Sequence, residues 1–199
     1  MVFPPNLNSI FDDTELFAET FLYIFDKKQN KTKLNLNAVQ KHYLKNKKQH
    51  NLVLKARQFG MSTVITADLF RIATVQRASV GVLAHDDDST QLLRRMANRF
   101  YENMPDDFRP NRKYANDRLT SYPDFDSEIF IASAGSLNKG RGGTFSHLHG
   151  SEVAFWPDAE KLVSGIMQAG DPFIVLESTA NGASGYFYNL VMEALDGNS

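Results

Sequence analysis

The sequence predicts an α/β fold whose central sheet is mostly parallel and is covered by helices. From residue 52 onward, short apolar runs of strand length, such as SVGVLA at 79–84, alternate with stretches of helical length. Such alternation is typical of parallel strands joined by crossover helices, with both faces of the sheet buried. With 199 residues, the chain suits one domain with a sizeable core, preceded by a small leader.

Composition indicates an ordinary globular protein and excludes several kinds of site. The chain is 42% hydrophobic and 23% charged, with a formal net charge of -1. It has no cysteine, which excludes disulfides, zinc–thiolate sites and thiol nucleophiles. Residues 1–10 lack the basic segment and apolar stretch of a signal peptide. No window approaches the roughly 18 apolar residues of a membrane span, so we expect no membrane partner.

Two helices are expected ahead of the alternating region. Residues 12–28 carry apolar side chains at helical spacing, and Asp12 and Asp13 stand where a helix N-terminus favours negative charge. Residues 29–33 form a polar break, and 36–46 suit a second short helix. We therefore assign 1–35 to an N-terminal helical leader and 36–199 to the main domain.

The remaining elements are expected in a regular order. The strands lie at 52–54, 79–84, 128–133, 145–149 and 173–176, and the helices at 63–75, 86–104, 157–169 and 186–195. Residues 105–125, with three prolines, are expected to be a loop or insertion. Asp86, Asp87 and Asp88 suit either a metal site or the first turn of a helix, where acids complement the helix dipole.

A lysine-rich segment spans residues 27–55, which hold nine lysines and no Asp or Glu. Such a run can follow a nucleic-acid backbone, with a steep dependence on salt. It is equally consistent with a solvated lysine-rich surface, and the sequence does not separate the two interpretations.

The most informative stretch is LVLKARQFGMST at 52–63, in which a buried strand runs into a tight turn and Ser-Thr opens a helix. Backbone N–H groups in such a loop converge on phosphate, and the hydroxyl can bind Mg²⁺. Compared with G-x-x-x-x-G-K-[ST], Gly60 and Ser62 match, but Met61 replaces the lysine. Lys55 and Arg57 can supply the cation that the phosphates need. A plain strand–turn–helix without a ligand is the alternative.

A second motif is FSHLHGSEVAFW at 145–156. Glu152 follows a predicted strand, where a hydrolytic phosphate-loop enzyme needs a carboxylate to polarise water. Ser151 precedes it in place of the usual Asp, and its uncharged hydroxyl is a weaker metal ligand. His147 and His149 share one face of the strand. They suit either a metal site or, since no third ligand is evident, a packed or hydrogen-bonded pair.

Two further segments present polar groups on loops. IVLESTANG at 174–182 delivers Ser178, Thr179 and Asn181 to a turn at the carboxyl end of a strand, where open α/β sheets bind ligands. NKGRGG at 138–143 is a basic, glycine-rich loop. Its Arg141 is either an exposed linker residue or a cation that reaches a neighbouring subunit's nucleotide.

KARQFGMST at 55–63 resembles the deviant Walker A loop of phage terminase large subunits. In many of these proteins Arg-Gln precedes the glycine, and in some the lysine stands at the front of the loop. The segments around Glu152 and at 174–182 resemble the family's Walker B and coupling motifs, in the same order. The resemblance spans roughly residues 36–195 and implies a P-loop NTPase fold of the RecA-like (ASCE) kind.

The resemblance also implies roles for individual residues. Lys55 is the relocated lysine, Arg57 touches the γ-phosphate, and Gln40 reads the adenine edge. Glu152 is the catalytic carboxylate, assisted by Arg57 and by Arg141 as an arginine finger. The full implied sets are ATP binding by Gln40, Lys55, Ala56, Arg57, Gln58, Phe59, Gly60, Met61, Ser62 and Thr63; coupling by Ser178, Thr179 and Asn181; and Mg²⁺ binding by Ser62 and Ser151.

The implied function is that of an ATP- and Mg²⁺-dependent motor, which moves double-stranded DNA into a procapsid in the host cytoplasm. Its implied partners are the DNA, a portal protein, a small terminase subunit and further copies in a ring. Family members carry a nuclease domain of RNase H type after the motor. Because this sequence stops at Ser199, we expect a shortened motor domain and no DNA cleavage.

Two departures from the family pattern keep other functions open. Met61 and Ser151 both fall at positions that touch phosphate or metal. They leave room for another RecA-like helicase or translocase, and for a nucleotide- or DNA-binding assembly module without turnover.

Overall fold

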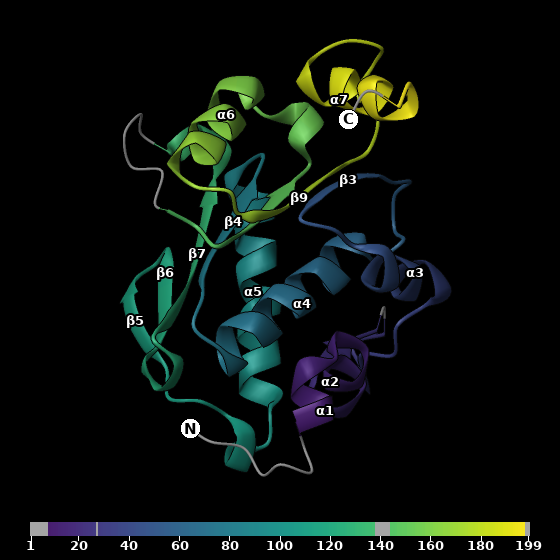
Figure 1. The fold of residues 1–199 in the computed structure, drawn as a ribbon. Coiled ribbons are helices and arrows are strands. Elements are labelled where there is room, and N and C mark those ends of the chain that lie inside the picture. Colours follow the sequence, from purple (N-terminus) through teal and green to yellow (C-terminus); the bar gives the residue numbers. More distant parts are fainter. Residues whose placement is uncertain (1–7, 27, 138–143, 198–199) are drawn as a thin grey trace.

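A mostly parallel sheet forms the centre of the computed structural model, which describes residues 8–26, 28–137 and 144–197 (Figure 1). Within these ranges the main sheet has seven strands in the order β3-β9-β8-β4-β7-β6-β5. The first five are parallel, and β6 and β5 continue the sheet antiparallel. The predicted α/β architecture is confirmed. The strands are β3 (His50–Leu54), β4 (Ser79–Ala84), β5 (Lys113–Asn116), β6 (Leu119–Tyr122), β7 (Ser127–Ser133), β8 (His147–Ser151) and β9 (Phe173–Ser178).

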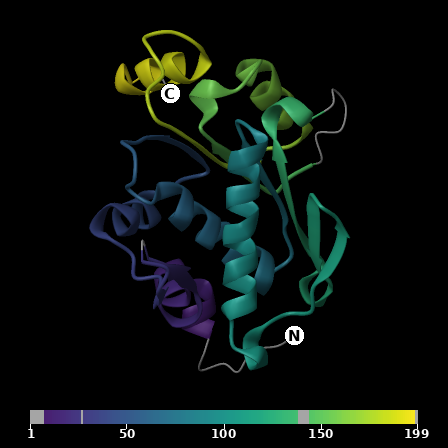
Figure 2. The ribbon, with the colours of Figure 1, turned by 180° about the vertical axis from the view of Figure 1, so that it is seen from behind.

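Helices cover both faces of the sheet, because alternate residues of a strand point to opposite faces and join two separate hydrophobic cores. Val80 and Val82 of β4 join the core beneath α4 (Met61–Val75) and α5 (Asp87–Asn103). Leu83, which follows Val82 and points to the opposite face, joins a second core with α6 (Ala159–Ala169) and α7 (Tyr186–Leu195). Figures 1 and 2 show α6 and α7 together at the top, away from the N-terminal helices.

The acidic triplet at 86–88 begins a helix, as one of its two interpretations predicts. Asp86 is the N-cap of α5, and its Oδ1 accepts a hydrogen bond from the Ser89 N–H at 2.7 Å. The described ranges contain no group of three or more His, Cys, Asp or Glu side chains suited to hold a metal. Nor does any helix within them combine the length and apolar character needed to cross a bilayer.

The helix predicted over 12–28 is wrong at its C-terminal half. The structure has α1 (Asn8–Asp12) and α2 (Thr14–Phe21), then β1 (Tyr23–Phe25) paired antiparallel with β2 (Lys31–Lys33). Tyr-Ile-Phe favours a strand, and Asp26 Oδ1 forms the turn by accepting from the Asn30 N–H at 2.8 Å. The prediction was wrong because the apolar residues of β1 happen to continue the helical spacing of the residues before them. The expected helix at 36–46 is present as α3 (Ala38–Asn46).

The N-terminal helices pack into the same core as α4. Phe11, Phe17 and Phe21 are buried there, with the Phe17 and Phe21 rings 5.3 Å apart. Arg71 of α4 donates from Nη1 to the Phe11 carbonyl at 2.8 Å. These segments are thus bound to the main body by apolar and polar contacts, while the domain boundary after residue 35 stays a prediction.

The loop expected at 105–125 contains a hairpin that widens the sheet. β6 pairs with β7 and β5 with β6, and Asn116 Oδ1 closes the turn by accepting from the Arg118 N–H at 2.8 Å. Tyr122 anchors the hairpin because its ring is buried in the core. Both strands have mostly polar sequences, so no apolar run marked them.

Several lysines of the 27–55 run face carboxylates from other segments. Lys41 pairs with Glu15 at 2.6 Å and with Glu19 at 3.2 Å, and Lys47 pairs with the buried Asp68. The run is thus partly neutralised within the described structure. DNA contact along it stays a prediction.

We expect Phe17→Ala to lower the free energy of unfolding by about 3–5 kcal/mol, because it empties a fully buried site between two other rings. Leu16→Ala, on the exposed side of the same helix, is the control and should cost less than about 0.5 kcal/mol. Urea unfolding measures both. Equal effects would show that α2 does not pack as described.

Candidate functional site

Three adjacent parallel strands end at one edge of the sheet and bring the predicted motifs together. β9 lies between β3 and β8, with Leu54 opposite Ser178 and Ser151 opposite Glu177. The Lys55 N–H extends this ladder by donating to the Ser178 carbonyl at 3.0 Å. Residues that follow the three strands therefore meet at the edge where open α/β sheets bind ligands.

The ammonium of Lys55 lies between two carboxylates. Its Nζ is 2.9 Å from Glu152 Oε1 and 2.8 Å from Glu177 Oε2. The side chains of Lys55, Glu152 and Glu177 are 12%, 23% and 0% exposed. Burial alone would lower the pKa of Lys55, but the two carboxylates raise it, so this lysine stays charged. The lysine at the front of the loop and the carboxylate of the second motif are thus in direct contact.

Glu177 is a site residue that the sequence interpretation missed, because the strand was expected to end at Leu176. Its Oε1 accepts hydrogen bonds from Ser62 Oγ at 2.7 Å and Ser151 Oγ at 2.9 Å, and lies 3.3 Å from His149 Nε2. Burial raises the pKa of Glu177, but His149 and Lys55 together bring it down to about 2. A glutamate inside an apolar strand that is covered on both faces was the signal that could have revealed it.

Glu152 is held by residues of the third motif. Its Oε2 accepts from Ser178 Oγ at 3.3 Å, from the Thr179 N–H at 3.2 Å and from Thr179 Oγ1 at 3.2 Å. Burial raises the pKa of Glu152, while Lys55 and the Thr179 amide outweigh it and leave the pKa lowered. Asn181 Nδ2 donates to the Ala154 carbonyl at 3.0 Å, two residues beyond Glu152. Glu152 and the predicted coupling residues Ser178, Thr179 and Asn181 are thus brought together.

The loop before α4 has the form that anion binding requires. Gly60 is the N-cap with φ 70°, and the Val64 N–H donates to its carbonyl at 3.1 Å. The N–H groups of Met61, Ser62 and Thr63 therefore precede the helical ladder, at the positive end of the helix dipole. Met61 is buried in the core, so the side chain at the usual lysine position points away from the site.

Gln40 lies against this loop. Its Nε2 donates to the Gly60 carbonyl at 2.8 Å, and its Oε1 accepts from the Asn37 N–H at 2.9 Å within a capping box. Asn37 Nδ2 in turn donates to the Phe59 carbonyl at 3.2 Å. The Gln40 amide nitrogen thus binds the loop while its oxygen binds the start of α3, and adenine reading stays a prediction.

The other predicted residues lie apart from the charged cluster. Ala56, Arg57, Gln58 and Phe59 are exposed on the loop, and Thr63 is partly buried in the first turn of α4. Arg141 lies outside the described residues. His147 Nδ1 is 2.9 Å from Ser146 Oγ and His149 faces Glu177, which confirms the hydrogen-bonded interpretation of this pair.

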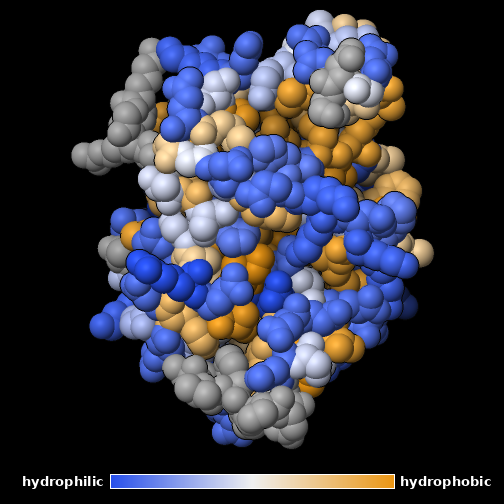
Figure 3. Space-filling model, in the orientation of Figure 1, coloured by the Kyte–Doolittle hydropathy of each residue, from blue (hydrophilic) through white to orange (hydrophobic). Residues whose placement is uncertain are grey.

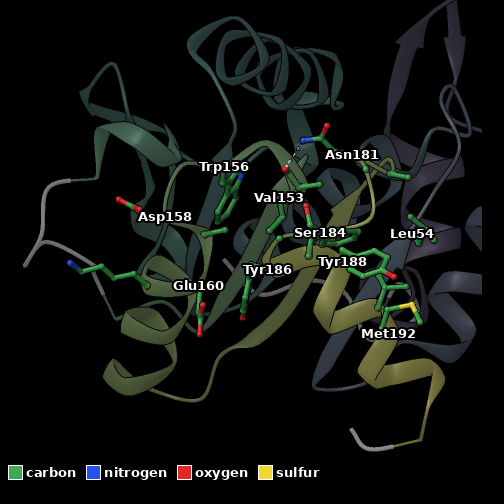
Figure 4. A pocket seen from close by; sticks show the side chains of 18 of the residues that line it. Leu54, Val153, Trp156, Asp158, Glu160, Asn181, Ser184, Tyr186, Tyr188 and Met192 are labelled. Carbon is green, nitrogen blue, oxygen red and sulfur yellow. Dashed lines mark hydrogen bonds between the residues drawn. The ribbon is translucent and has the colours of Figure 1, made fainter.

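A cavity of about 870 Å³ lies beside the site, between η5 (Val153–Phe155), α6, α7 and the loop after β9. Figure 4 shows Trp156, Tyr186 and Tyr188 around it, with Asn181 at one border. Figure 3 shows apolar surface gathered near α7. Among the predicted site residues that the structure describes, only Asn181 lines this cavity, so the cavity is distinct from the phosphate-type loop.

Comparison with known proteins identifies the fold. No protein-family model and no curated protein matches the sequence. The solved large terminase of bacteriophage HK97 superposes with a TM-score of 0.78 at 13% identity, covering 94% of this chain and 41% of that one. The large-terminase ATPase domain of Thermus phage P74-26 gives a TM-score of 0.62 at 17% identity, covering 77% and 68%. The chain therefore shares the fold of these terminase structures, and it spans less than half of the HK97 protein.

We expect Gly60→Ala to destabilise the protein more than Gly182→Ala. Both glycines have positive φ. A Cβ added at Gly60 would lie 2.7 Å from Gln40 Nε2, whereas a Cβ added at Gly182 would have no atom within 4 Å apart from those of its chain neighbours. Gly182→Ala should cost about 1 kcal/mol from backbone strain alone, and Gly60→Ala about 2–3 kcal/mol. Urea unfolding measures the difference. Equal costs would contradict the close packing of Gln40 on the loop.

Proposed function

We propose that this chain is the ATPase motor domain of a viral DNA-packaging terminase, coupling ATP hydrolysis to the translocation of double-stranded DNA into a procapsid. The observation that carries the proposal is the contact of Lys55 with Glu152, at the point where a phosphate-type loop meets the carboxylate of the second motif. The fold shared with terminase ATPase domains supports it.

ATP binding is assigned to the loop and the first turn of α4. Backbone N–H groups at the helix N-terminus hold phosphate oxygens, and Lys55 turns from the carboxylates to the β- and γ-phosphates. Arg57 has no ionic partner within the described structure and is free to reach the γ-phosphate. The hydroxyls of Ser62 and Ser151 are hard oxygen donors within 3 Å of one carboxylate oxygen, and they fit Mg²⁺. When bound, Mg²⁺ neutralises charge on the phosphates.

Hydrolysis is assigned to Glu152, which orients the attacking water and accepts its proton. In the structure Lys55 holds Glu152 Oε1, and this contact is released when the ammonium turns to the phosphates. Oε2 stays bound to Ser178 and Thr179. A displacement of Glu152 during hydrolysis is therefore transmitted directly to the loop after β9, which gives Ser178, Thr179 and Asn181 the coupling role.

The wider assembly is part of the same proposal. Copies of the chain form a ring on a portal protein in the host cytoplasm, a small terminase subunit delivers the DNA, and Arg141 reaches the nucleotide of a neighbour. No DNA cleavage is assigned to these residues. Another RecA-like helicase would instead separate the strands of a forked duplex, and an assembly module would bind ATP without turnover.

We expect Glu152→Gln to reduce DNA-stimulated ATP hydrolysis by about 10²–10⁴-fold, because the amide cannot accept the proton of the attacking water. Its affinity for ATP should change by only a few-fold. Phosphate release and equilibrium nucleotide binding measure the two quantities on the full chain. If the wild type binds ATP but shows no turnover with DNA, the motor assignment fails.

We expect Lys55→Ala to weaken ATP binding by about 10- to 100-fold, since one charge-assisted contact contributes roughly 1.5–3 kcal/mol. The exposed Lys45→Ala is the matched control, because it removes the same charge away from the loop. Circular dichroism checks that both variants are folded. If Lys55→Ala binds ATP as tightly as the wild type, Lys55 does not take the place of the usual P-loop lysine.

A further inference from the structure

The second motif lacks its usual acid on β8, where Ser151 stands. The adjacent strand supplies a carboxylate at the same level, because Ser151 and Glu177 are paired in register between β8 and β9. The Ser151 hydroxyl donates to Glu177 Oε1 at 2.9 Å. The negative charge missing from one strand is thus present, within hydrogen-bond distance, on its neighbour.

Glu177 also contacts Ser62, the hydroxyl residue at the start of α4 that would bind Mg²⁺. Ser62 Oγ donates to the same Oε1 at 2.7 Å, although the two residues are 115 positions apart in the chain. Glu177 is fully buried, and a buried carboxylate is costly unless it is paired. Lys55 and His149 supply that pairing, so the charge of Glu177 is held beside the loop by partners on other elements.

We propose that Glu177 supplies the carboxylate of the Mg²⁺ site, in place of the acid that β8 lacks at Ser151. This inference rests on the proposed ATPase function and goes beyond it by assigning the metal to a residue of β9. Ser62 and Ser151 provide the hydroxyls on either side of Glu177 Oε1.

The chemistry of the donors fits a magnesium ion that arrives with phosphates. Mg²⁺ prefers oxygen ligands and is typically held by one or two carboxylates together with substrate phosphates and water. His149 Nε2, 3.3 Å from Oε1, acts as a positioning group for the carboxylate.

Charge balance links this site to Lys55. In the structure the Lys55 ammonium is 2.8 Å from Glu177 Oε2 and 2.9 Å from Glu152 Oε1, so one cation serves two carboxylates. When Lys55 turns to the phosphates, Glu177 is left buried without its cationic partner. A divalent cation beside Ser62 restores that partner, so the binding of metal and the movement of Lys55 favour each other.

The test compares the affinity for a fluorescent ATP analogue in Mg²⁺ with that in EDTA, for the wild type and Glu177→Gln. Electron paramagnetic resonance of Mn²⁺ reports metal binding separately from activity. We expect the wild type to bind more tightly with Mg²⁺, and Glu177→Gln to lose about 10-fold or more of this enhancement. Its affinity in EDTA should stay within a few-fold of the wild type.

Two further variants separate a metal role from a structural one. Asp68→Asn alters another buried, ion-paired carboxylate, which lies on α4 beyond its first turn. It should lower thermal stability and leave the Mg²⁺ enhancement unchanged. The double variant Ser151→Asp with Glu177→Ser returns the acid to β8 and should recover the enhancement.

The outcomes distinguish this inference from the proposed function. If the wild type binds no nucleotide, both the ATPase proposal and the assignment of Glu177 are contradicted. A Mg²⁺-dependent wild type, with equal dependence in Glu177→Gln, would overturn the role of Glu177 and leave the ATPase proposal standing. If Glu177→Gln does not fold, the double variant decides: recovery supports the assignment, and a folded double variant without Mg²⁺ enhancement overturns it.

Discussion

The placement of one ammonium between two carboxylates is the interaction on which the site depends. Lys55 is mostly buried, and its Nζ lies within 3 Å of both Glu152 and Glu177. Removing charges from water is costly, and the attraction offsets that cost only when the geometry is good. The cluster therefore requires β3, β9 and β8 to be adjacent and in register. The contact between Lys55 N–H and Ser178 O continues that register to the lysine itself.

The two departures from the usual P-loop pattern have related physical explanations. Met61 is buried in the core, so a cation at that position would be taken out of water without a partner. Lys55, at the end of the preceding strand, reaches the site from the sheet edge instead. On β8, Ser151 leaves room beside the buried Glu177, whereas two carboxylates so close would repel each other. The changes at Met61 and Ser151 thus fit a rearranged set of charges.

The same strand edge joins the proposed catalytic residue Glu152 to the proposed coupling turn. Glu152 contacts Lys55 through one oxygen and the Ser178–Thr179 turn through the other. Its backbone has φ 56°, a left-handed conformation that is uncommon for a residue other than glycine. Local strain of this kind persists only when surrounding contacts hold it, and here Lys55 and Thr179 do so. Because Glu152 Oε2 binds both Ser178 and Thr179, a displacement of the Glu152 side chain would act directly on that turn.

The sequence by itself determined the α/β class and, apart from the hairpin at 105–125, the order of the strands and helices after residue 52. It also singled out Lys55 and Glu152, which the structure places in contact. Apolar runs and turn residues are local signals, and they suffice for these features. They failed at 12–28, where helical spacing of apolar residues continues into the strand β1. They also failed at 105–125, where short, largely polar strands are stabilised by pairing and by buried rings such as Tyr122. Only the tertiary structure decided that Glu177 belongs to the site. Its partners Ser62 and Ser151 lie on other elements, and a hydrogen bond across 115 residues depends on strand order, which no local pattern records.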